Sequence, residues 1–465
     1  MSSADAKQRR RRAVRQLLDR IDYERGATIP DRSAGLKLDR MHQLLQRLGQ
    51  PQRGLRAVHV AGTKGKGSTS AMLAAILNAA GHSVGLYTSP HLENLKQRFQ
   101  INGRSCSDLE LAELLETIWP HVEAMDEQCG GPAHGPTYFE ITTAAAMLHF
   151  RRRQTDLAVL EVGLGGRLDS TNLCLPDLCL ITNISFDHTR QLGAKLGHFA
   201  REKAGIIKPG VPVISGVRTT EPRNVIGEVA QEHGCRLREL GEHFRIEYLG
   251  GAANDGGEPL SRFRYFGGTA GSNQEPRDVS SRMLGRHQAE NAALALAAVD
   301  ELRNQGWSLP DDAVRAGLQS VRCPARIEVC GANPTVVLDA AHNVASVEAL
   351  VETLDEHFVD PVRWLVFATT QDKDVAGMLD RLLPRFDHIL LTRYLKSPRA
   401  VPTEQLQQIA QSMTNKPMLT FEDPRDAWKY ARAEASPGDL ICVTGSFFLA
   451  AELRGAIRRD NRARD

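Results

Sequence analysis

The segment VHVAGTKGKGSTSAML (residues 58–73) decides the fold of the first half of the chain. An apolar run ends at a glycine, a turn with three glycines and two lysines follows, and an alanine-rich helical pattern begins directly afterwards. A strand, a glycine-rich turn and a helix N-terminus gather backbone N–H groups around one point, and together with a lysine they bind phosphate. The segment departs from the general pattern of Gly, four residues and Gly-Lys-Ser/Thr, because Gly67 separates Lys66 from Ser68. We predict a phosphate site, and the alternative is a flexible glycine turn with a solvated lysine.

The residues of this turn have separate expected roles. Lys66 is expected to reach the β- and γ-phosphates of a nucleotide, and Ser68 or Thr69 is expected to face a magnesium ion. The backbone N–H groups at the start of the helix point toward the same place and favour an anion there. The predicted nucleotide-binding residues, which we call the phosphate loop, are Gly62, Thr63, Lys64, Gly65, Lys66, Gly67, Ser68 and Thr69.

The length and composition indicate a two-domain globular protein. The chain has 465 residues, which exceeds what one hydrophobic core usually serves. Hydrophobic residues make up 42% of the chain and charged residues 25%, and the formal net charge of +2 argues against a general nucleic-acid binder. The basic run at residues 7–20 continues into a helical pattern of Val14, Leu17, Leu18 and Ile21, so a solvated helix face is favoured over a polyanion site.

The sequence also indicates a cellular compartment. No apolar stretch approaches the roughly 20 residues of a membrane span, and no signal peptide precedes the charged start. The eight cysteines are scattered without a CxxC pair, so neither a disulfide framework nor a zinc site is indicated. We expect a soluble enzyme in a reduced, cytoplasmic compartment.

Short apolar runs alternate with helical patterns along the chain. In the first half, the expected strands are 55–62, 82–90, 156–166 and 177–185, and the expected helices are 68–81 and 137–153. Strands that alternate with helices indicate a parallel sheet with helices on both faces, and ligands of such sheets lie beyond the carboxyl ends of the strands. The sequence therefore predicts an α/β fold with its site at that edge.

The second half begins with an irregular segment and then resumes the alternation. Residues 250–281 are rich in Gly, Asn and Ser and indicate an exposed hairpin or irregular insertion, and a strong helix over 286–306 follows. Four more strands are expected at 335–343, 362–374, 388–394 and 439–446. Because Pro324 interrupts the pattern, we place a domain boundary near residues 322–325.

Several polar residues follow the expected strands. Glu161 ends an apolar strand, and a buried acid in that place needs a partner or a metal ion, with a structural ion pair as the alternative. The turn 169–172 has the composition of an ordinary loop. Lys203 beside Glu202 has the pattern of a helix-surface lysine, and His188 that of a helix-capping or surface histidine.

Two motifs carry a family resemblance. HVAGTKGKGST (59–69) and EVGLGGRLDSTN (161–172) resemble the folylpolyglutamate synthase and dihydrofolate synthase family, whose loop characteristically has a glycine after the lysine. This family belongs to the amide-forming ligases that include the Mur enzymes, and the resemblance runs from residue 20 to residue 454. It implies an N-terminal P-loop-type, parallel-sheet ATPase domain (1–322) and a smaller, Rossmann-like α/β C-terminal domain (325–465).

The resemblance also implies the members of the site. It implies ligands of two magnesium ions, namely Ser68, Ser89, Glu161 and His188, and a carbamylated Lys203 near the metal. Carbamylation requires a desolvated lysine with a lowered pKa. The implied catalytic residues are Lys66, Glu161, His188 and Lys203, and the implied further nucleotide contacts are Asn291, Arg326, Asp339, His342 and Lys373. Motifs around His287, Gln288, Asn343 and Ser446 match the family as well. From the residues alone, Arg326 could equally form a surface ion pair and His342 could be a turn residue.

Three positions depart from the family pattern. Gln97 stands where the family usually has glutamate, and Ala340 and Ala368 stand where it usually has glycine. None of these is a proposed metal or phosphate ligand. Each is expected to narrow the substrate cleft, since one methyl group counts where a ligand approaches the backbone.

The activity implied by the resemblance is ATP-dependent ligation. L-Glutamate would be added through an acyl phosphate to dihydropteroate, to the γ-carboxylate of a tetrahydrofolate polyglutamate, or to both. The expected partners are these small molecules with ATP, and we expect no nucleic acid, no membrane and a monomer. Two alternatives remain open, namely a ligase of the same fold that acts on a non-folate carboxylate and a non-catalytic ATP-binding protein.

Overall fold

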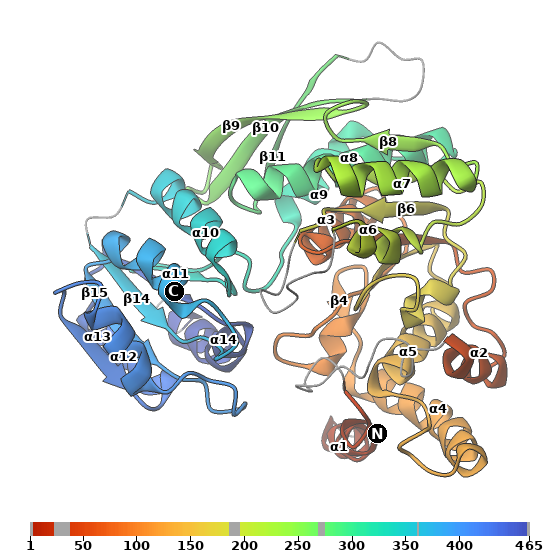
Figure 1. Cartoon of the computed structure of the whole chain (residues 1–465), viewed down its shortest axis with the longest axis horizontal. Coiled ribbons are helices and arrows are strands. Elements are labelled where there is room, and N and C mark those ends of the chain that lie inside the picture. The colour runs from red at the N-terminus through yellow and green to blue at the C-terminus, as the bar shows by residue number, and fades with distance from the viewer. Residues whose placement is uncertain (1–2, 23–37, 186–195, 268–274, 360–361, 463–465) are drawn as a thin grey trace. The chain divides into compact units, whose positions relative to one another are not determined.

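The computed structural model describes residues 3–22, 38–185, 196–267, 275–359 and 362–462 (Figure 1). The chain forms two compact units. The first contains Met1–Glu247, Arg264–Val279 and Glu290–Ser320, and the second contains Tyr248–Phe263, Ser280–Ala289 and Val321–Asp465. The units therefore exchange segments between residues 248 and 289, while the domain limits 1–322 and 325–465 stay a prediction.

The first unit is built on an eight-stranded sheet in the order β4-β3-β2-β5-β1-β6-β7-β8. Its strands are β1 (Ala57–Ala61), β2 (Val84–Tyr87), β3 (Phe99–Ile101), β4 (Arg104–Ser105), β5 (Leu157–Glu161), β6 (Leu178–Ile181), β7 (Val213–Ser215) and β8 (Leu237–Glu239). The strands from β2 to β8 in this order pair in parallel, and β3 and β4 add an antiparallel edge. Every residue of β1, β5 and β6 is buried, as expected for a parallel sheet covered on both faces. The predicted α/β fold is confirmed.

The strand register brings three carboxyl ends to one edge of this sheet. Val60 of β1 pairs with Glu161 of β5, and Ala61 pairs with Ile181 of β6. The segments that follow these strands therefore begin beside one another. They contain the phosphate loop, the turn after Glu161 and the polar residues after Ile181.

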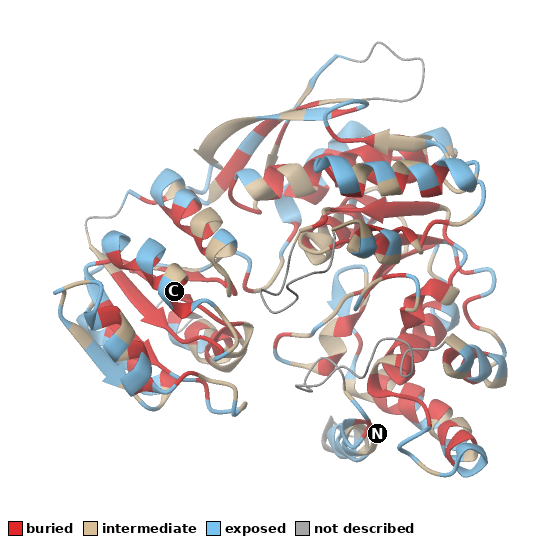
Figure 2. Ribbon diagram, viewed as in Figure 1, coloured by how far each residue is buried: buried red, intermediate tan, exposed pale blue. Residues whose placement is uncertain are grey.

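Helices pack against this sheet and against one another. They are α1 (Ser3–Leu18), α2 (Leu38–Arg47), α3 (Lys66–Ala79), α4 (Asp108–Cys129), α5 (Tyr138–Arg152), α6 (Leu196–Ala204), α7 (Thr220–Glu232), α8 (Arg286–Asn304) and α9 (Asp311–Ser320), with short 3-10 helices η1 (Leu95–Arg98) and η2 (Ser170–Leu173). Figure 2 shows that α5 is buried along most of its length. None of the helices in the described ranges combines the length and apolarity needed to cross a membrane.

The basic N-terminal run forms a helix with one buried face. Leu17 of α1 is completely buried in the same core as α4 and α5, and Arg9 forms an ion pair with Glu116 of α4. The helical pattern had included Leu18 and Ile21, but these side chains are 48% and 41% exposed because the helix ends at Leu18. The predicted solvated helix face is therefore present on α1, and part of its charge is paired.

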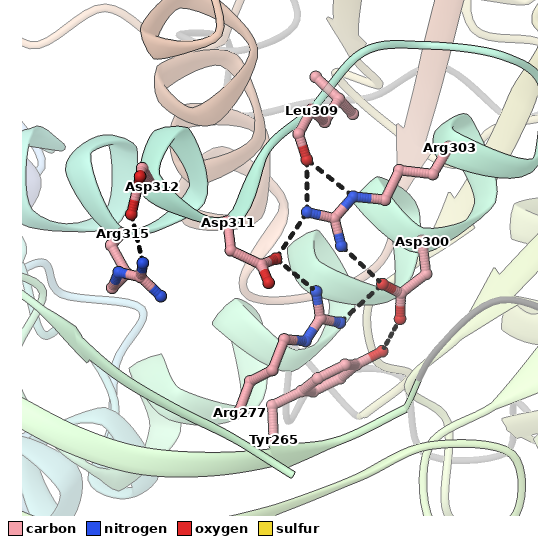
Figure 3. A network of polar contacts seen from close by, with 8 residues as sticks. All are labelled: Tyr265, Arg277, Asp300, Arg303, Leu309, Asp311, Asp312 and Arg315. Carbon is pink, nitrogen blue, oxygen red and sulfur yellow. Dashed lines mark hydrogen bonds and ion pairs between the residues drawn. The ribbon is translucent and has the colours of Figure 1, made fainter. Parts of the chain in front are cut away.

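The segment after residue 244 is more regular than its composition suggests. The strands β9 (Arg245–Ala253), β10 (Pro259–Phe266) and β11 (Arg277–Ser281) form a three-stranded sheet in the order β11-β10-β9. The expected hairpin is confirmed, although residues 268–274 lie outside the described part and β11 was not predicted. Figure 3 shows how the buried carboxylate of Asp300 in α8 holds this region, since it accepts hydrogen bonds from Tyr265 (2.8 Å) and Arg277 (2.6 Å).

The second unit contains a six-stranded sheet in the order β12-β13-β17-β14-β15-β16. Its strands are β12 (Glu328–Ala332), β13 (Thr335–Leu338), β14 (Arg363–Phe367), β15 (His388–Thr392), β16 (Met418–Phe421) and β17 (Leu440–Thr444). The helices are α10 (Val344–His357), α11 (Val375–Leu382), α12 (Thr403–Gln411), α13 (Pro424–Glu434) and α14 (Phe447–Arg462), with a 3-10 turn η3 (Leu383–Arg385). Only β12 is antiparallel among these strands. The four strands predicted for this half are confirmed, and β12 and β16 add an edge on each side.

Candidate functional site

The glycines of the phosphate loop are required by close contacts. Gly62 has φ 149°, and a Cβ atom there would lie 1.9 Å from the Oγ1 atom of Thr182. Gly65 has φ 83°, and a Cβ atom there would lie 2.2 Å from the Oδ1 atom of Asn291 in α8. Any side chain at either position would have to displace its neighbour. The structure thus places the predicted nucleotide contact Asn291 against the phosphate loop.

Polar residues after β6 hold the loop in place. The backbone N–H groups of Thr63 and Lys64 donate to Asn183, to its carbonyl oxygen and its Oδ1 atom respectively, each over 2.8 Å. The Thr182 hydroxyl donates to the carbonyl oxygen of Lys64 over 2.6 Å. We did not predict this role. The available signal was the TNIS segment directly after a buried strand that neighbours β1.

The helix α3 begins within the loop. Gly65 is its N-cap residue, and no side chain of the described part caps it, so its first N–H groups are available to an anion. The ammonium of Lys66 donates to the carbonyl oxygens of Gly62 (3.1 Å) and Thr63 (3.4 Å) and so lies folded over the loop. Ser68 and Thr69 are buried, and the Thr69 hydroxyl has no hydrogen-bond partner in the described structure. This arrangement is an anion site with hydroxyl groups at its base.

Glu161 lies between the phosphate loop and the segment after β2. Its side chain is only 4% exposed, and its Oε2 atom accepts a hydrogen bond from the backbone N–H of Ser89 over 3.2 Å. The same oxygen lies 3.4 Å from the position that a Cβ atom of Gly67 would take. The structure therefore brings together Ser89, Glu161 and the start of α3, which carries Ser68.

These oxygen groups fit a magnesium ion. A buried carboxylate and nearby serine residues form the kind of hard oxygen ligand set that magnesium prefers. Magnesium usually keeps several water ligands in addition. Among the described residues there is no cluster of three or more histidine, cysteine or acidic side chains that could hold a metal by itself. Since magnesium usually binds through one or two carboxylates and phosphate oxygens, a site completed by a nucleotide agrees with this ligand set. His188, the predicted ligand of a second ion, lies outside the described residues.

The turn 169–172 is not an ordinary loop. Asp169 is 5% exposed and accepts hydrogen bonds from the N–H groups of Gly163 (3.0 Å) and Leu164 (2.9 Å), just after Glu161. It also accepts the Thr171 hydroxyl over 2.5 Å, and burial raises the pKa of Asp169. Because the Thr171 hydroxyl donates to Asp169, it accepts from the Nε2 atom of the fully buried His59 (2.8 Å). This network fixes the turn that follows Glu161.

Lys203 is buried rather than exposed. It lies near the end of α6 with 8% exposure, so the surface-lysine interpretation is wrong, while the expected helix is confirmed. The turn after Glu161 covers its backbone, because the N–H of Arg167 donates to Glu202 over 2.8 Å and a Cβ atom on Gly166 would lie 3.1 Å from the Cα atom of Lys203. Burial is the condition that carbamylation requires.

The second unit contains the predicted nucleotide contacts Arg326, Asp339, His342 and Lys373. Asp339 ends β13 and is buried, and its oxygens accept the N–H groups of Ile327 (2.8 Å) and Ala341 (2.7 Å). Arg326 is exposed, and it forms no ion pair with any residue in the described part of the chain. Burial raises the pKa of Asp339, and the positive charge of Arg326 offsets part of that rise.

The other motif residues of this unit lie in turns. The Nδ1–H group of His342 donates to the Ala340 carbonyl oxygen over 2.9 Å, and Asn343 caps α10. Lys373 lies between β14 and α11, 3.3 Å from Asp372. His287 begins α8, and burial together with the charge of Arg326 lowers its pKa to about 4. The buried residues Gln288 and Ser446 complete the set.

The three departures from the family pattern have local structural explanations. The Oε1 atom of Gln97 accepts the N–H groups of Leu92, Glu93 and Asn94 at 3.1, 2.9 and 3.3 Å, which an acid in its place would also accept. Ala340 and Ala368 are 2% and 0% exposed, so protein atoms surround their methyl groups.

Comparisons with known proteins agree with this architecture. A family model described as the Mur ligase middle domain matches residues 60–299, and one described as Mur ligase, glutamate ligase domain matches residues 325–447. The dihydrofolate synthase/folylpolyglutamate synthase of Bacillus subtilis is 36% identical over 423 residues, which cover 90% of this chain and 95% of that protein. The protein of the same name from Mycobacterium tuberculosis is 35% identical and covers 93% of this chain and 92% of its own.

Solved structures give the same result. The folylpolyglutamate synthase of Mycobacterium tuberculosis complexed with ADP superimposes with a TM-score of 0.84 and 31% identity, covering 98% of this chain and 100% of that one. The folylpolyglutamate synthase of Thermotoga maritima gives a TM-score of 0.82 at 30% identity, covering 96% of each chain. With both ligase domains matched and these relatives similar over nearly their whole length, the chain belongs to the dihydrofolate synthase and folylpolyglutamate synthase family of Mur ligases.

Proposed function

We propose that the protein is an ATP-dependent ligase that joins L-glutamate to dihydropteroate, to the γ-carboxylate of a tetrahydrofolate polyglutamate, or to both. The observation that carries this proposal is the meeting of the phosphate loop with the buried carboxylate of Glu161 at one sheet edge. Two relatives that this chain covers over more than nine tenths of their length are named dihydrofolate synthase/folylpolyglutamate synthase. A folylpolyglutamate synthase of similar structure was solved with ADP.

The reaction requires transfer of the γ-phosphoryl group to a substrate carboxylate oxygen, which gives an acyl phosphate and ADP. The amine nitrogen of glutamate then attacks the acyl carbon, phosphate leaves, and the nitrogen loses a proton as the amide forms. Phosphoryl transfer is accelerated mainly by positioning and by charge stabilisation. Lys66 and the N–H groups at the start of α3 offer this stabilisation in a fixed geometry.

Magnesium would supply further positive charge next to the transferring phosphoryl group. The residues proposed to hold it are Ser68, Ser89 and Glu161, with His188 at a second ion. The buried Lys203 is proposed to carry a carbamate, which would add an anionic oxygen ligand on the same side of the sheet. In the second unit, Arg326, Asp339, His342 and Lys373 are proposed nucleotide contacts, and Asn291 is one in the first unit.

The proposal also covers the cellular compartment and the oligomeric state of the enzyme. All eight cysteines are free thiols, which supports a reducing, cytoplasmic compartment. We propose that the enzyme acts as a monomer on small molecules.

The proposal is tested by phosphate release from Mg-ATP with L-glutamate and one of three acceptor conditions, namely dihydropteroate, tetrahydrofolate or none. We expect release that depends on an acceptor, a product heavier by one glutamate residue, and loss of both in Lys66→Ala. The control is Lys429→Ala, which removes an exposed lysine of α13 that pairs with Asp426 and belongs to no proposed site. Nucleotide binding without turnover on either acceptor would instead support a non-catalytic protein, and turnover on another acid would support a different ligase.

A further inference from the structure

Arg326 lies in a backbone segment of unusual conformation. Its neighbours Ala325 and Ile327 both have left-handed conformations, with φ of 53° and 47°. Residues other than glycine seldom adopt this conformation, and a β-branched isoleucine is a clear outlier there. Such a backbone persists only where surrounding groups determine it, and it is concentrated at functional sites. The segment 325–327 therefore needs groups that hold it.

Two carboxylates hold this segment from its two ends. The Oδ2 atom of Asp339 accepts the N–H of Ile327 over 2.8 Å, and the Oε2 atom of Glu328 accepts the N–H of Ala325 over 3.0 Å. The carbonyl oxygen of Ala325 accepts the N–H of Ala340 over 3.1 Å. The peptide groups on both sides of Arg326 are thus fixed by named partners.

An arginine of the last helix, α14, holds the side chain of Glu328 in place. Arg454 of α14 donates to it through Nε and Nη2, each with a closest distance of 2.8 Å, in a two-pronged pair. The Arg454 side chain is 8% exposed and that of Glu328 is 20% exposed. Arg454 therefore restricts the orientation of the Glu328 carboxylate. This carboxylate is the group that accepts the backbone N–H of Ala325.

The guanidinium between these fixed peptide groups is exposed. Arg326 donates to the neighbouring Ala325 carbonyl (3.2 Å) and forms no ion pair with any described residue. Burial lowers the pKa of His287 and the positive charge of Arg326 lowers it further, while the same charge offsets part of the rise that burial causes in the pKa of Asp339. This cation is held on a strained backbone and has no acidic partner among the described residues, so it is arranged to meet an anionic ligand.

We propose that Asp339, Glu328 and Arg454 are positioning residues that hold Arg326 against an anionic group of the nucleotide. This inference rests on the proposed function, because that function supplies the nucleotide. Asp339 thereby gains a positioning role in addition to its predicted nucleotide contact, because each of its two carboxylate oxygens accepts one backbone N–H group and keeps further acceptor capacity. Glu328 and Arg454 acquire a role that neither the sequence motifs nor the family resemblance had given them.

A double-mutant cycle on ADP affinity tests this proposal. We expect Arg326→Ala to weaken ADP binding, measured by calorimetry with magnesium present, by about tenfold, as for loss of a charge-assisted hydrogen bond. Glu328→Ala should weaken it several-fold in the wild-type background and leave it unchanged in the Arg326→Ala background. The control is Asp355→Ala, which breaks the Arg363–Asp355 pair of the same unit and should leave ADP affinity unchanged.

A second variant separates positioning from stability. Ala325→Gly relieves the left-handed strain, so the melting temperature should stay the same or rise, while ADP affinity falls because Arg326 is held less firmly. If Glu328→Ala does not fold, Glu328→Gln and Arg454→Lys replace it, since both retain part of the hydrogen bonding. Unchanged ADP affinity in Ala325→Gly and in the Glu328 variants overturns the proposal. The assay requires no ligation, so a wild-type protein that binds ADP but forms no glutamate product contradicts the proposed function alone.

Discussion

An Oε atom of Glu161 lies 3.4 Å from the point that a Cβ atom on Gly67 would occupy. A methyl group on this residue would therefore make an ordinary van der Waals contact with the carboxylate, and a longer side chain would compete with it for space. A threonine or serine at this position would place its side chain against the acid that we propose as a metal ligand. The loop and Glu161 are parts of one arrangement.

Gly67→Ala is expected to separate stability from activity. Gly67 lies in the first turn of α3, where alanine favours the helix by up to about 1 kcal/mol, so the free energy of unfolding should not fall. The rate of ligation should fall by no more than about tenfold, because the added methyl group would lie beside the Glu161 carboxylate at an ordinary contact distance of 3.4 Å. The control is Gly227→Ala in α7, where a Cβ atom would meet nothing within 4 Å. A Gly67→Ala enzyme with full activity would show that Glu161 tolerates the added methyl group.

Asp300 is expected to be important for the stability of the first unit. Its fully buried carboxylate is paired with Arg277 and accepts a hydrogen bond from the Tyr265 hydroxyl (Figure 3). Burial of Tyr265 and, to a smaller extent, the negative charge of Asp300 raise the pKa of Tyr265 well above its usual value. Asp300→Ala leaves the partly buried Arg277 without this partner and should lower the free energy of unfolding by about 3–5 kcal/mol. Urea denaturation measures this change.

Asp312→Ala is the control from the same region. Asp312 pairs with Arg315 three residues away, its side chain is 91% exposed, and such pairs contribute less than about 1 kcal/mol. Equal losses of stability in Asp300→Ala and Asp312→Ala would contradict the importance of the buried network.

His59 predicts a dependence of stability on pH. Burial, with a smaller effect of Lys208, lowers its pKa from 6.5 to about 3. Between these values the unfolded chain binds the proton and the folded protein does not, so the contribution of His59 to stability decreases as pH falls from about 6.5 toward 3. The slope is about 1.4 kcal/mol per pH unit at most.

His59→Gln isolates this contribution, since its amide nitrogen can still donate to Thr171. The difference in unfolding free energy between the wild type and the variant, measured by urea denaturation at several pH values, should move in favour of the variant at lower pH. A difference that does not change with pH would mean that His59 titrates alike in both states.

Gln97→Glu is expected to be nearly silent. The carboxylate can accept the three N–H groups that Gln97 accepts now, but it loses the donation of Nε2 to Glu93 (3.3 Å) and meets a like charge. The free energy of unfolding should change by less than about 1 kcal/mol, and KM for the folate acceptor should stay within about twofold. A larger change in KM would show that residue 97 contacts the substrate.

The sequence predicted most of the architecture because the central strands, such as β6 and β17, are mostly apolar and are followed by polar or glycine-containing segments. It failed where polar residues are buried by contacts between distant segments. Asp169 and Thr171 look like an ordinary turn, and only the fold brings them to His59 and to the turn after Glu161. Lys203 looks exposed because its neighbours are charged, although the turn containing Gly166 covers it. The strained backbone around Arg326 likewise has no signal in composition, since neither Ala325 nor Ile327 favours it.

The central claim is that a substrate carboxylate is phosphorylated by ATP before glutamate attacks. The most direct measurement uses dihydropteroate or tetrahydrofolate whose reacting carboxylate carries heavy oxygen, with Mg-ATP and L-glutamate, and follows the label by mass spectrometry. Passage through an acyl phosphate predicts that one labelled oxygen appears in the released phosphate for each amide formed. Amide formation in which the displaced labelled oxygen appears in water, and the released phosphate carries no label, would contradict the proposed reaction.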